Sequence, residues 1–221
     1  MITVHHLEDS RSQRVLWLLE ELGVEYDVKR YERDKQTRLA PAALKKVHGL
    51  GKSPVVEHDG VVVAETGAIV EYLIDRFGDG GFRPTADERD ALQYTYWMHF
   101  AEGSMMPQLL LKLFFSQIKA AKMPFFAKPI ANGIADRVLR TYVDPNLAEQ
   151  VAFVDAHLKA NDWFAGPEIS GADIMMSFPL EAAKSRGAIN DSPAITAYID
   201  RFQARPAFRR ALERGGDYAY A

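Results

Sequence analysis

The chain has 221 residues, of which 48% are hydrophobic and 26% charged, with a formal net charge of -3 and no cysteine. These values describe a globular protein, and they exclude a basic nucleic-acid-binding surface, disulfides, thiolate metal sites and a cysteine nucleophile. No apolar run approaches the roughly 20 residues of a membrane span, and the first residues lack a signal-peptide pattern, so we expect a cytoplasmic protein without a membrane partner.

The first part of the chain alternates strand and helix patterns. Residues 2–6 alternate apolar and polar side chains, as a strand does, and residues 15–22 carry apolar side chains at helical spacing before Gly23. Residues 25–31 repeat the strand pattern. A strand, a helix and a strand with such short joints predict a right-handed parallel crossover.

The same part continues with a short helix expected at 41–47 and two strands, 53–57 and 61–64, around an Asp59-Gly60 turn. A further helix is expected over residues 65–77. The expected order of elements is therefore βαβαββα, which is an α/β arrangement.

Glycines and a proline after this helix indicate a linker over residues 80–86, which divides a domain at 1–79 from one at 87–221. Beyond it only helical spacing recurs, over residues 85–120, 124–160, 172–185, 192–204 and 206–214. We expect Pro107 to kink the first of these helices. Asp144 and Pro145 should break the second, with Asp144 as the N-cap. The second domain is expected to be all-helical.

The loop between the first strand and the first helix reads Asp9-Ser10-Arg11-Ser12-Gln13-Arg14. The N–H groups at a helix N-terminus stabilise an anion placed there. Ser10 and Gln13 also fit a capping box, which gives the serine a purely structural alternative role.

Three further segments carry recognisable patterns. Gly51-Lys52-Ser53-Pro54-Val55 precedes a strand, and Glu65-Thr66-Gly67-Ala68-Ile69 opens a helix. Ser170 and Asp173 fit a capping box flanked by Ile169 and Ile174 at the positions of a hydrophobic staple. Taken alone, each segment predicts only a turn or a capped helix.

All four segments, in this order, resemble the cytosolic glutathione transferase family over the full length of the chain. The serine-type members (theta-like or related bacterial and fungal types) are the most similar. The resemblance implies a thioredoxin-like glutathione-binding domain followed by an all-helical domain, and a cis peptide bond before Pro54.

The resemblance also implies a role for each matching residue. The backbone of Ser53 would pair with the cysteinyl unit of glutathione, Lys52 would reach its glycyl carboxylate, and Arg11 would face the pocket mouth. Glu65 would take the γ-glutamyl ammonium and Thr66 the γ-glutamyl carboxylate. Ser10 would donate a hydrogen bond to the thiolate, with Ser12 as the alternative.

Such a hydrogen bond would be enough to activate the thiol. A thiol with a pKa of about 8.5 is only about 3% ionised at pH 7. Lowering the pKa by about two units needs about 2.7 kcal/mol, which one charge-assisted hydrogen bond and a helix dipole supply. No general base is required.

The second substrate is expected to lie between the domains, against the first long helix. The candidate residues are Met105, Met106, Leu109, Phe114 and Phe115, with Tyr218 and Tyr220 near the C-terminus. For each of them a place in the helical core is the alternative. Glu102 and His99 lie on the same helix and could touch glutathione indirectly. The histidines lack ligand spacing, so we expect no metal.

The predicted function is a glutathione transferase that conjugates glutathione to a hydrophobic electrophile or reduces an organic peroxide, acting as a homodimer. Two alternatives stay open. One is a non-catalytic ligand carrier or protein-interaction module with the same fold. The other is a glutathione-dependent isomerase, which the absence of a serine-serine-cysteine run disfavours.

Overall fold

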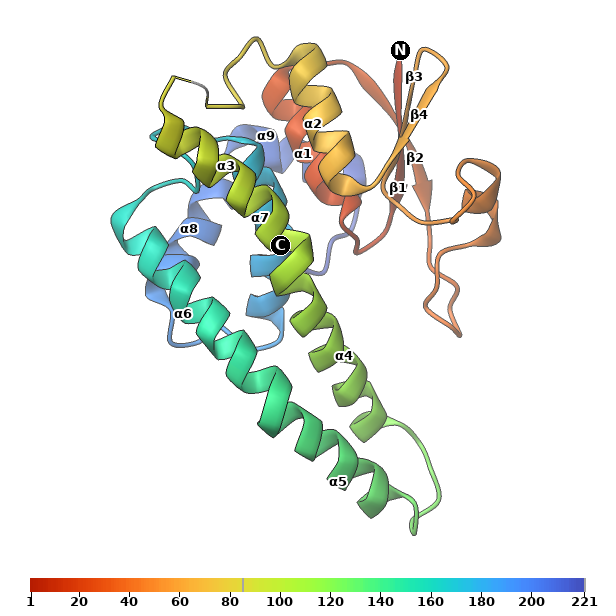
Figure 1. Cartoon of the computed structure of the whole chain (residues 1–221). Coiled ribbons are helices and arrows are strands. Elements are labelled where there is room, and N and C mark those ends of the chain that lie inside the picture. The colour runs from red at the N-terminus through yellow and green to blue at the C-terminus, as the bar shows by residue number, and fades with distance from the viewer. Residues whose placement is uncertain (85, 221) are drawn as a thin grey trace.

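The computed structural model describes residues 1–84 and 86–220. The first part forms a four-stranded sheet in the order β2-β1-β3-β4 with helices beside it (Figure 1). Strand β1 pairs in parallel with β2, while β3 is antiparallel to both β1 and β4. The elements are β1 (Ile2–Leu7), α1 (Ser12–Leu22), β2 (Tyr26–Tyr31), the 3₁₀ helix η1 (Ala42–Lys46), β3 (Val55–His58), β4 (Val61–Ala64) and α2 (Thr66–Phe77). The expected order of elements is confirmed.

Helix α1 is enclosed by other elements along most of its length. It contacts β1 and α2 on one side and α7 and α9 on the other. Residues 12–19 are therefore all buried, including the full Trp17 side chain. The helix ends at Gly23, whose φ of 65° is left-handed and whose N–H donates to the Leu19 carbonyl.

The second part is all-helical, as expected. Its elements are α3 (Glu88–Phe100), the π-helical turn η2 (Ala101–Met105), α4 (Met106–Ala120), α5 (Lys128–Val138), the π-helical turn η3 (Leu139–Val143), α6 (Asp144–Ala160), α7 (Gly171–Ser185), α8 (Pro193–Gln203) and α9 (Pro206–Gly215). Helices α4 and α5 project from the body as a hairpin (Figure 1). The predicted linker includes Thr85, which lies outside the described residues, and the domain boundaries stay predictions.

Each of two long helical segments contains a π-helical turn that ends two residues before a proline, Pro107 in one segment and Pro145 in the other. Met106 donates its N–H to the Ala101 carbonyl, and Asp144 donates to the Leu139 carbonyl, five residues back in each case. Pro107 follows the turn η2 closely, and the kink expected there stays a prediction. The expectation of a break with Asp144 as N-cap is wrong, because the wider turn η3 lets the helix continue. Asp144 instead accepts a hydrogen bond from Lys112 at 2.8 Å.

The capping box at the start of α7 is confirmed. The Ser170 hydroxyl accepts the N–H of Ala172 at 3.3 Å, and the Asp173 carboxylate accepts the N–H of Ser170 at 2.9 Å. The other oxygen of Asp173 accepts the N–H of Phe164 and the hydroxyl of Tyr198, both at 3.0 Å. This fully buried carboxylate holds the start of the central helix α7, against which α1, α2 and α3 pack.

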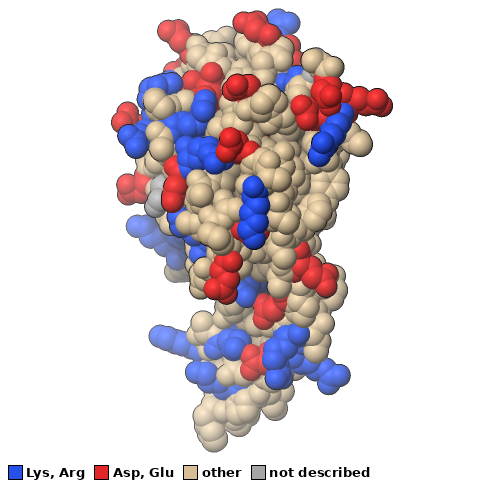
Figure 2. Space-filling view, turned by 90° about the vertical axis from the view of Figure 1, so that its left-hand side faces the viewer, with Lys and Arg blue, Asp and Glu red and all other residues tan. Residues whose placement is uncertain are grey.

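The surface mixes both signs of charge over the body, while the end of the α4–α5 hairpin is free of charge in Figure 2. Phe125 and Phe126, between these helices, are 88% and 65% exposed. No helix of the described residues is long and apolar enough to cross a membrane.

Candidate functional site

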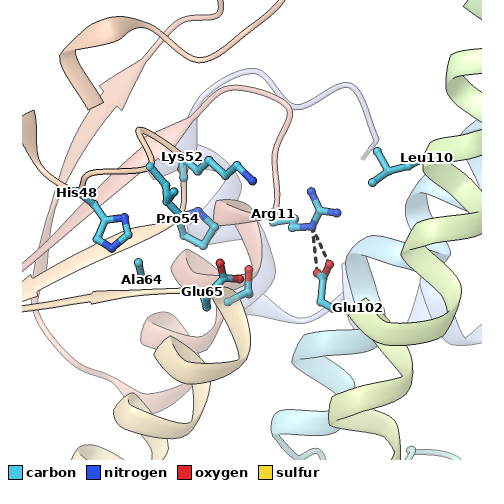
Figure 3. A pocket seen from close by; sticks show the side chains of 11 residues that line it. Arg11, His48, Lys52, Pro54, Ala64, Glu65, Glu102 and Leu110 are labelled. Carbon is cyan, nitrogen blue, oxygen red and sulfur yellow. Dashed lines mark hydrogen bonds and ion pairs between the residues drawn. The ribbon is translucent and has the colours of Figure 1, made fainter. Parts of the chain in front are cut away.

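One cavity, with a volume of about 270 Å³, opens between the first part of the chain and the helical part. It runs from His48 and Ala64 at one end to Glu102 and Leu110 at the other (Figure 3). Its lining residues are Arg11, His48, Leu50, Lys52, Ser53, Pro54, Ala64, Glu65, Thr66, Glu102 and Leu110. All six residues predicted to bind glutathione therefore lie around a single cavity.

Ser53 presents its backbone to this cavity while its side chain is used internally. The Ser53-Pro54 peptide bond is cis, as the resemblance implied. The Ser53 hydroxyl donates to the His5 carbonyl at 2.8 Å and accepts the N–H of Leu7 at 3.2 Å. Neither the N–H nor the carbonyl of Ser53 has a hydrogen-bond partner among the described residues. The hydroxyl thus fixes the turn against β1 and leaves two backbone groups free to pair with a ligand.

Glu65 stands in a rare backbone conformation at the start of α2. Its φ of 72° and ψ of 126° are unusual for a residue with a side chain and cost about 1–3 kcal/mol. The side chain of Glu65, which is the N-cap residue, makes no capping hydrogen bond to α2. The first N–H groups of α2, beginning with that of Thr66, are available to an anion, and the Glu65 carboxylate beside them can pair with a cation.

Arg11 forms the opposite wall and is tied to Glu102. Its Nε lies 3.0 Å from both carboxylate oxygens of Glu102, which belongs to the turn η2 (Figure 3). Arg14 donates to the same carboxylate at 2.5 Å and to the Met175 carbonyl. Burial raises the pKa of Glu102, but the charges of Arg14 and then Arg11 outweigh it, so the pKa of Glu102 is lowered.

Ser10 and Ser12 do not line the cavity. The Ser10 hydroxyl donates to the Leu7 carbonyl at 2.8 Å and lies 2.8 Å from the Ser12 hydroxyl. The Ser12 hydroxyl in turn lies 2.8 Å from Nδ1 of His6. Burial, helped by the Arg30 charge, lowers the pKa of His6 to about 4, so this imidazole is neutral at pH 7. Ser10 is 6% exposed and Ser12 0%, which leaves Ser10 as the hydroxyl nearer the surface.

The expected capping box of Ser10 with Gln13 is not formed. Helix α1 has Arg11 at its N-cap position without a side-chain cap, and both polar atoms of the Gln13 side chain lack a partner. Gln13 is buried against α9, where a Cβ atom on Gly215 would lie 2.6 Å from its Oε1. The Gln13 side chain therefore faces α9 and makes no capping hydrogen bond to Ser10, although the Gln13 N–H donates to the Ser10 carbonyl at 3.2 Å.

The predicted apolar substrate residues also need correction. Met105, Met106 and Leu109 are 0%, 3% and 0% exposed and belong to the core. Phe114 is 54% exposed on the hairpin, and neither it nor Phe115 lines the cavity. The next residue after Leu109, Leu110, lines the cavity instead, because consecutive helical residues point about 100° apart. His99 does not line the cavity either.

Sequence reasoning missed His48, Leu50, Ala64 and Leu110, and it named Glu102 only as an indirect contact. His48 had a readable signal, because it stands four residues before Lys52, in the segment that leads into the same turn. Among residues 1–84 and 86–220, no group of three or more His, Asp or Glu side chains is placed to hold a metal ion.

Comparisons with known proteins indicate the same family as the sequence motifs. Residues 1–75 match the family "Glutathione S-transferase, N-terminal domain", and residues 117–206 match "Glutathione S-transferase, C-terminal domain". Glutathione S-transferase 1 of Saccharomyces cerevisiae is 34% identical, over 97% of this chain and 95% of the relative.

Solved structures extend the similarity to three dimensions. A glutathione S-transferase from Actinobacillus pleuropneumoniae superposes with a TM-score of 0.81 at 31% identity, covering 100% of this chain and 95% of that one. A sphingomonad glutathione S-transferase, solved in complex with glutathione, has the same fold, with a TM-score of 0.73 at 22% identity over 97% of this chain and 98% of its own.

Proposed function

The chain belongs to the glutathione S-transferase family, and we propose that it binds glutathione in the cavity between Pro54, Glu65 and Glu102. The observation that carries this proposal is the convergence of the six predicted residues on one cavity. Structures of family members with bound glutathione support the choice of co-substrate.

The charges around the cavity match those of the tripeptide. Glutathione carries one ammonium group and two carboxylates at neutral pH. Glu65 would pair with the ammonium, and the N-terminus of α2 at Thr66 would hold the γ-glutamyl carboxylate. Lys52, with His48 beside it, would hold the glycyl carboxylate. The free N–H and carbonyl of Ser53 would pair with the cysteinyl unit like an added strand.

We assign thiolate stabilisation to Ser10. Its hydroxyl has two internal acceptors, the Leu7 carbonyl and Ser12, so its proton must turn about the Cβ–Oγ bond, away from these acceptors, to reach a bound thiolate. The thiolate is a stronger acceptor than either of them. Ser12 is the poorer candidate because it is 0% exposed and its hydroxyl is engaged with His6. The activated thiolate would then displace the leaving group of a hydrophobic electrophile. With an organic hydroperoxide it would break the O–O bond, which releases the alcohol and leaves glutathione sulfenic acid, and a second glutathione would convert this acid to the disulfide and water.

A glutathione-binding carrier without catalysis is the second candidate. The observation in its favour is that the hydroxyls of Ser10 and Ser12 are both engaged internally and that neither serine lines the cavity. Both candidates require an intact glutathione site, so they differ only in the state of the bound thiol.

Binding and turnover separate the two candidates. The protein is passed over immobilised glutathione, and conjugation to 1-chloro-2,4-dinitrobenzene and reduction of cumene hydroperoxide are then assayed. Retention together with conjugation supports the transferase. Retention without turnover of either substrate supports the carrier, and no retention by the parent protein refutes the glutathione site itself.

We also propose a cytoplasmic homodimer. Several apolar side chains are exposed on the edge strand β4 and on α3, namely Val61 (50%), Val62 (45%), Leu92 (67%) and Tyr96 (43%). An exposed edge strand and an apolar helix face are costly in water and suit an isologous contact. Multi-angle light scattering should give twice the chain mass of 24.8 kDa, and the Leu92→Glu variant should give the monomer.

A further inference from the structure

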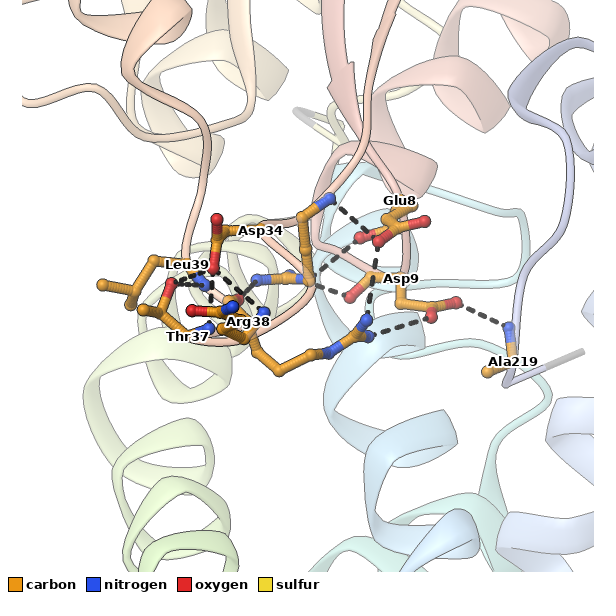
Figure 4. A network of polar contacts seen from close by, with 9 residues as sticks. Glu8, Asp9, Asp34, Thr37, Arg38, Leu39 and Ala219 are labelled. Carbon is orange, nitrogen blue, oxygen red and sulfur yellow. Dashed lines mark hydrogen bonds and ion pairs between the residues drawn. The ribbon is translucent and has the colours of Figure 1, made fainter.

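The segment after α9 returns to the loop that carries Ser10. Helix α9 ends at Gly215, and Gly216 has a φ of 83°, a value that suits glycine and redirects the chain. We call residues 217–220 the C-terminal strap. In Figure 4 this end of the chain passes beside Asp9, where the N–H of Ala219 donates to Asp9 Oδ1 at 2.8 Å.

A second anchor fixes the strap to helix α7. The Tyr218 hydroxyl donates to Oε2 of Glu181 at 2.6 Å, and Gln203 donates to Oε1 of the same carboxylate at 2.9 Å. Glu181 is only 2% exposed, and each of its two carboxylate oxygens accepts one of these hydrogen bonds. A buried carboxylate with two neutral donors is costly to maintain, and here it holds the strap.

Two arginines also contact the segment that contains Asp9. Arg33 donates to the carbonyls of Glu8 and Asp9, both at 3.2 Å, and Arg38 lies 4.0 Å from the Asp9 carboxylate (Figure 4). Asp9 has a left-handed φ of 46°, which aspartate tolerates. Because Asp9 directly precedes Ser10, any shift of its backbone moves the serine.

The strap also reaches the cavity wall through an aromatic pair. The Tyr220 ring packs edge-on against Phe178, with the ring centres 5.5 Å apart. The guanidinium groups of Arg11 and Arg14 lie over the Phe178 ring, at 5.7 and 5.6 Å from its centre. Arg11 lines the cavity, so Phe178 links the strap to one cavity residue that follows Ser10 directly in the chain.

We propose that the C-terminal strap holds in place the loop that carries Ser10 and Arg11, and that Asp9 and Glu181, its two anchors, are positioning residues. The proposal rests on the proposed function for the identity of the reactants. Among the described residues, the hydrogen bonds of the strap go to Asp9, Glu181 and Gln203, and none goes to Lys52, Ser53, Glu65 or Thr66. Loss of the strap should therefore impair the reaction with the electrophile and spare the binding of glutathione.

A chain ending at Asp217 tests the proposal against the full-length protein. We expect kcat/KM for 1-chloro-2,4-dinitrobenzene to fall by about tenfold to a hundredfold, as for displaced reacting groups, while KM for glutathione changes by less than about twofold. Amide hydrogen exchange at residues 8–12 should become faster in the shortened chain. Glu213→Gln, an exposed change on the last turn of α9, is the matched control and should alter neither readout.

The Asp9 anchor is tested by Asp9→Gly and Asp9→Asn. Glycine tolerates the left-handed φ but removes the acceptor, so it should reproduce the shortened chain. Asparagine keeps an acceptor oxygen for the Ala219 N–H and should restore most of the parent rate. Combining Asp9→Gly with the shortened chain should add little to either change alone, because both remove the same contact.

The outcomes separate this proposal from the proposed function. If the parent protein neither binds nor conjugates glutathione, the proposed function fails. The hydrogen-exchange measurement still tests whether the strap holds residues 8–12 in place. If residues 8–12 exchange at the parent rate in the shortened chain, or if its kinetic loss falls on KM for glutathione, the positioning role is refuted.

Discussion

The buried guanidinium of Arg14, 1% exposed, lies 2.5 Å from the carboxylate of Glu102, a residue of the π-helical turn that precedes α4. Arg14 is on the first helix of the chain, so this ion pair joins the thioredoxin-like part to the helical part. Arg11 shares the same carboxylate at 3.0 Å. One glutamate therefore neutralises two arginines at the wall of the cavity.

Neutralising this glutamate should weaken the fold and change its response to acid. Glu102→Gln leaves the buried Arg14 uncompensated and should lower the free energy of unfolding by about 2 kcal/mol at pH 7. The folded-state pKa of Glu102 lies below its usual 4.5, so its contribution is present above that pH and is lost as the pH falls through the folded value. Urea unfolding between pH 3 and pH 7 measures both effects.

The difference between Glu102→Gln and the parent should therefore shrink only below pH 4.5. Glu149→Gln, an exposed change on α6, is the control and should follow the parent at every pH. A constant difference down to pH 3 would contradict the assignment of the effect to the ionised carboxylate.

The two serines should respond differently to alanine. Ser10→Ala should raise the pKa of the thiol of bound glutathione by about one to two units, because it removes the proposed hydrogen-bond donor to the thiolate. Ser12→Ala should leave that pKa unchanged and lower the free energy of unfolding by about 1–3 kcal/mol, because the Leu7 N–H and His6 Nδ1 lose a buried partner. Thiolate absorbance of the complex against pH, with urea unfolding, distinguishes them. If Ser12→Ala raises the thiol pKa and Ser10→Ala does not, Ser12 is the residue that stabilises the thiolate.

Lys52 should act on glutathione binding alone. Lys52→Met removes the cation proposed for the glycyl carboxylate and should raise KM for glutathione by about tenfold, with kcat changed by less than about twofold. Lys46→Met is the matched control, since Lys46 is an exposed lysine on η1 that does not line the cavity. Steady-state kinetics at varied glutathione and saturating electrophile give both constants. A fall in kcat without a change in KM would place Lys52 elsewhere in the reaction.

The fold could be read from the sequence because its signals are local. Strand alternation, helical spacing and the Asp59-Gly60 turn each lie within a few residues, and the capping box at Ser170 and Asp173 depends on one helix start. The two π-helical turns could not be predicted from the sequence. A proline within a helical pattern is found both where a helix ends and where it widens into a π-helical turn. Asp144 was misassigned for this reason.

The cavity was readable only where a short segment carried its residues. Lys52, Ser53 and Pro54 come from one turn and Glu65 and Thr66 from one helix start, so the family resemblance of these two short segments was enough to group them. Gln13 was misread because its environment is set by Gly215, which is distant in sequence. Met105, Met106 and Leu109 were misread because the rotation of α4 about its axis is decided by packing against the rest of the core.

Asp173 should be the most destabilising single site outside the cavity. Asp173→Ala leaves the N–H groups of Phe164 and Ser170 and the Tyr198 hydroxyl without their buried acceptor, and we expect a loss of about 3–5 kcal/mol. Asp162→Asn, at a side chain that is 76% exposed and paired with Arg201, is the control and should cost less than about 1 kcal/mol. Thermal and urea unfolding provide the measurement. Equal losses in the two variants would contradict the central role of the α7 capping box.

Glu181 should make stability depend on pH in the opposite sense to Glu102. Burial raises its folded-state pKa to about 7, despite hydrogen bonds from Tyr218 and Gln203 that favour the ionised form. A group with a raised folded pKa stabilises fully below its unfolded value, here 4.5, and this contribution is lost as the pH rises toward 7. Glu181→Gln removes the titrating proton, so relative to the parent the variant should gain about 3 kcal/mol between pH 4.5 and pH 7, at about 1.4 kcal/mol per pH unit. Urea unfolding of both proteins across this range measures the gain, and a difference that does not vary with pH would show that Glu181 is ionised throughout.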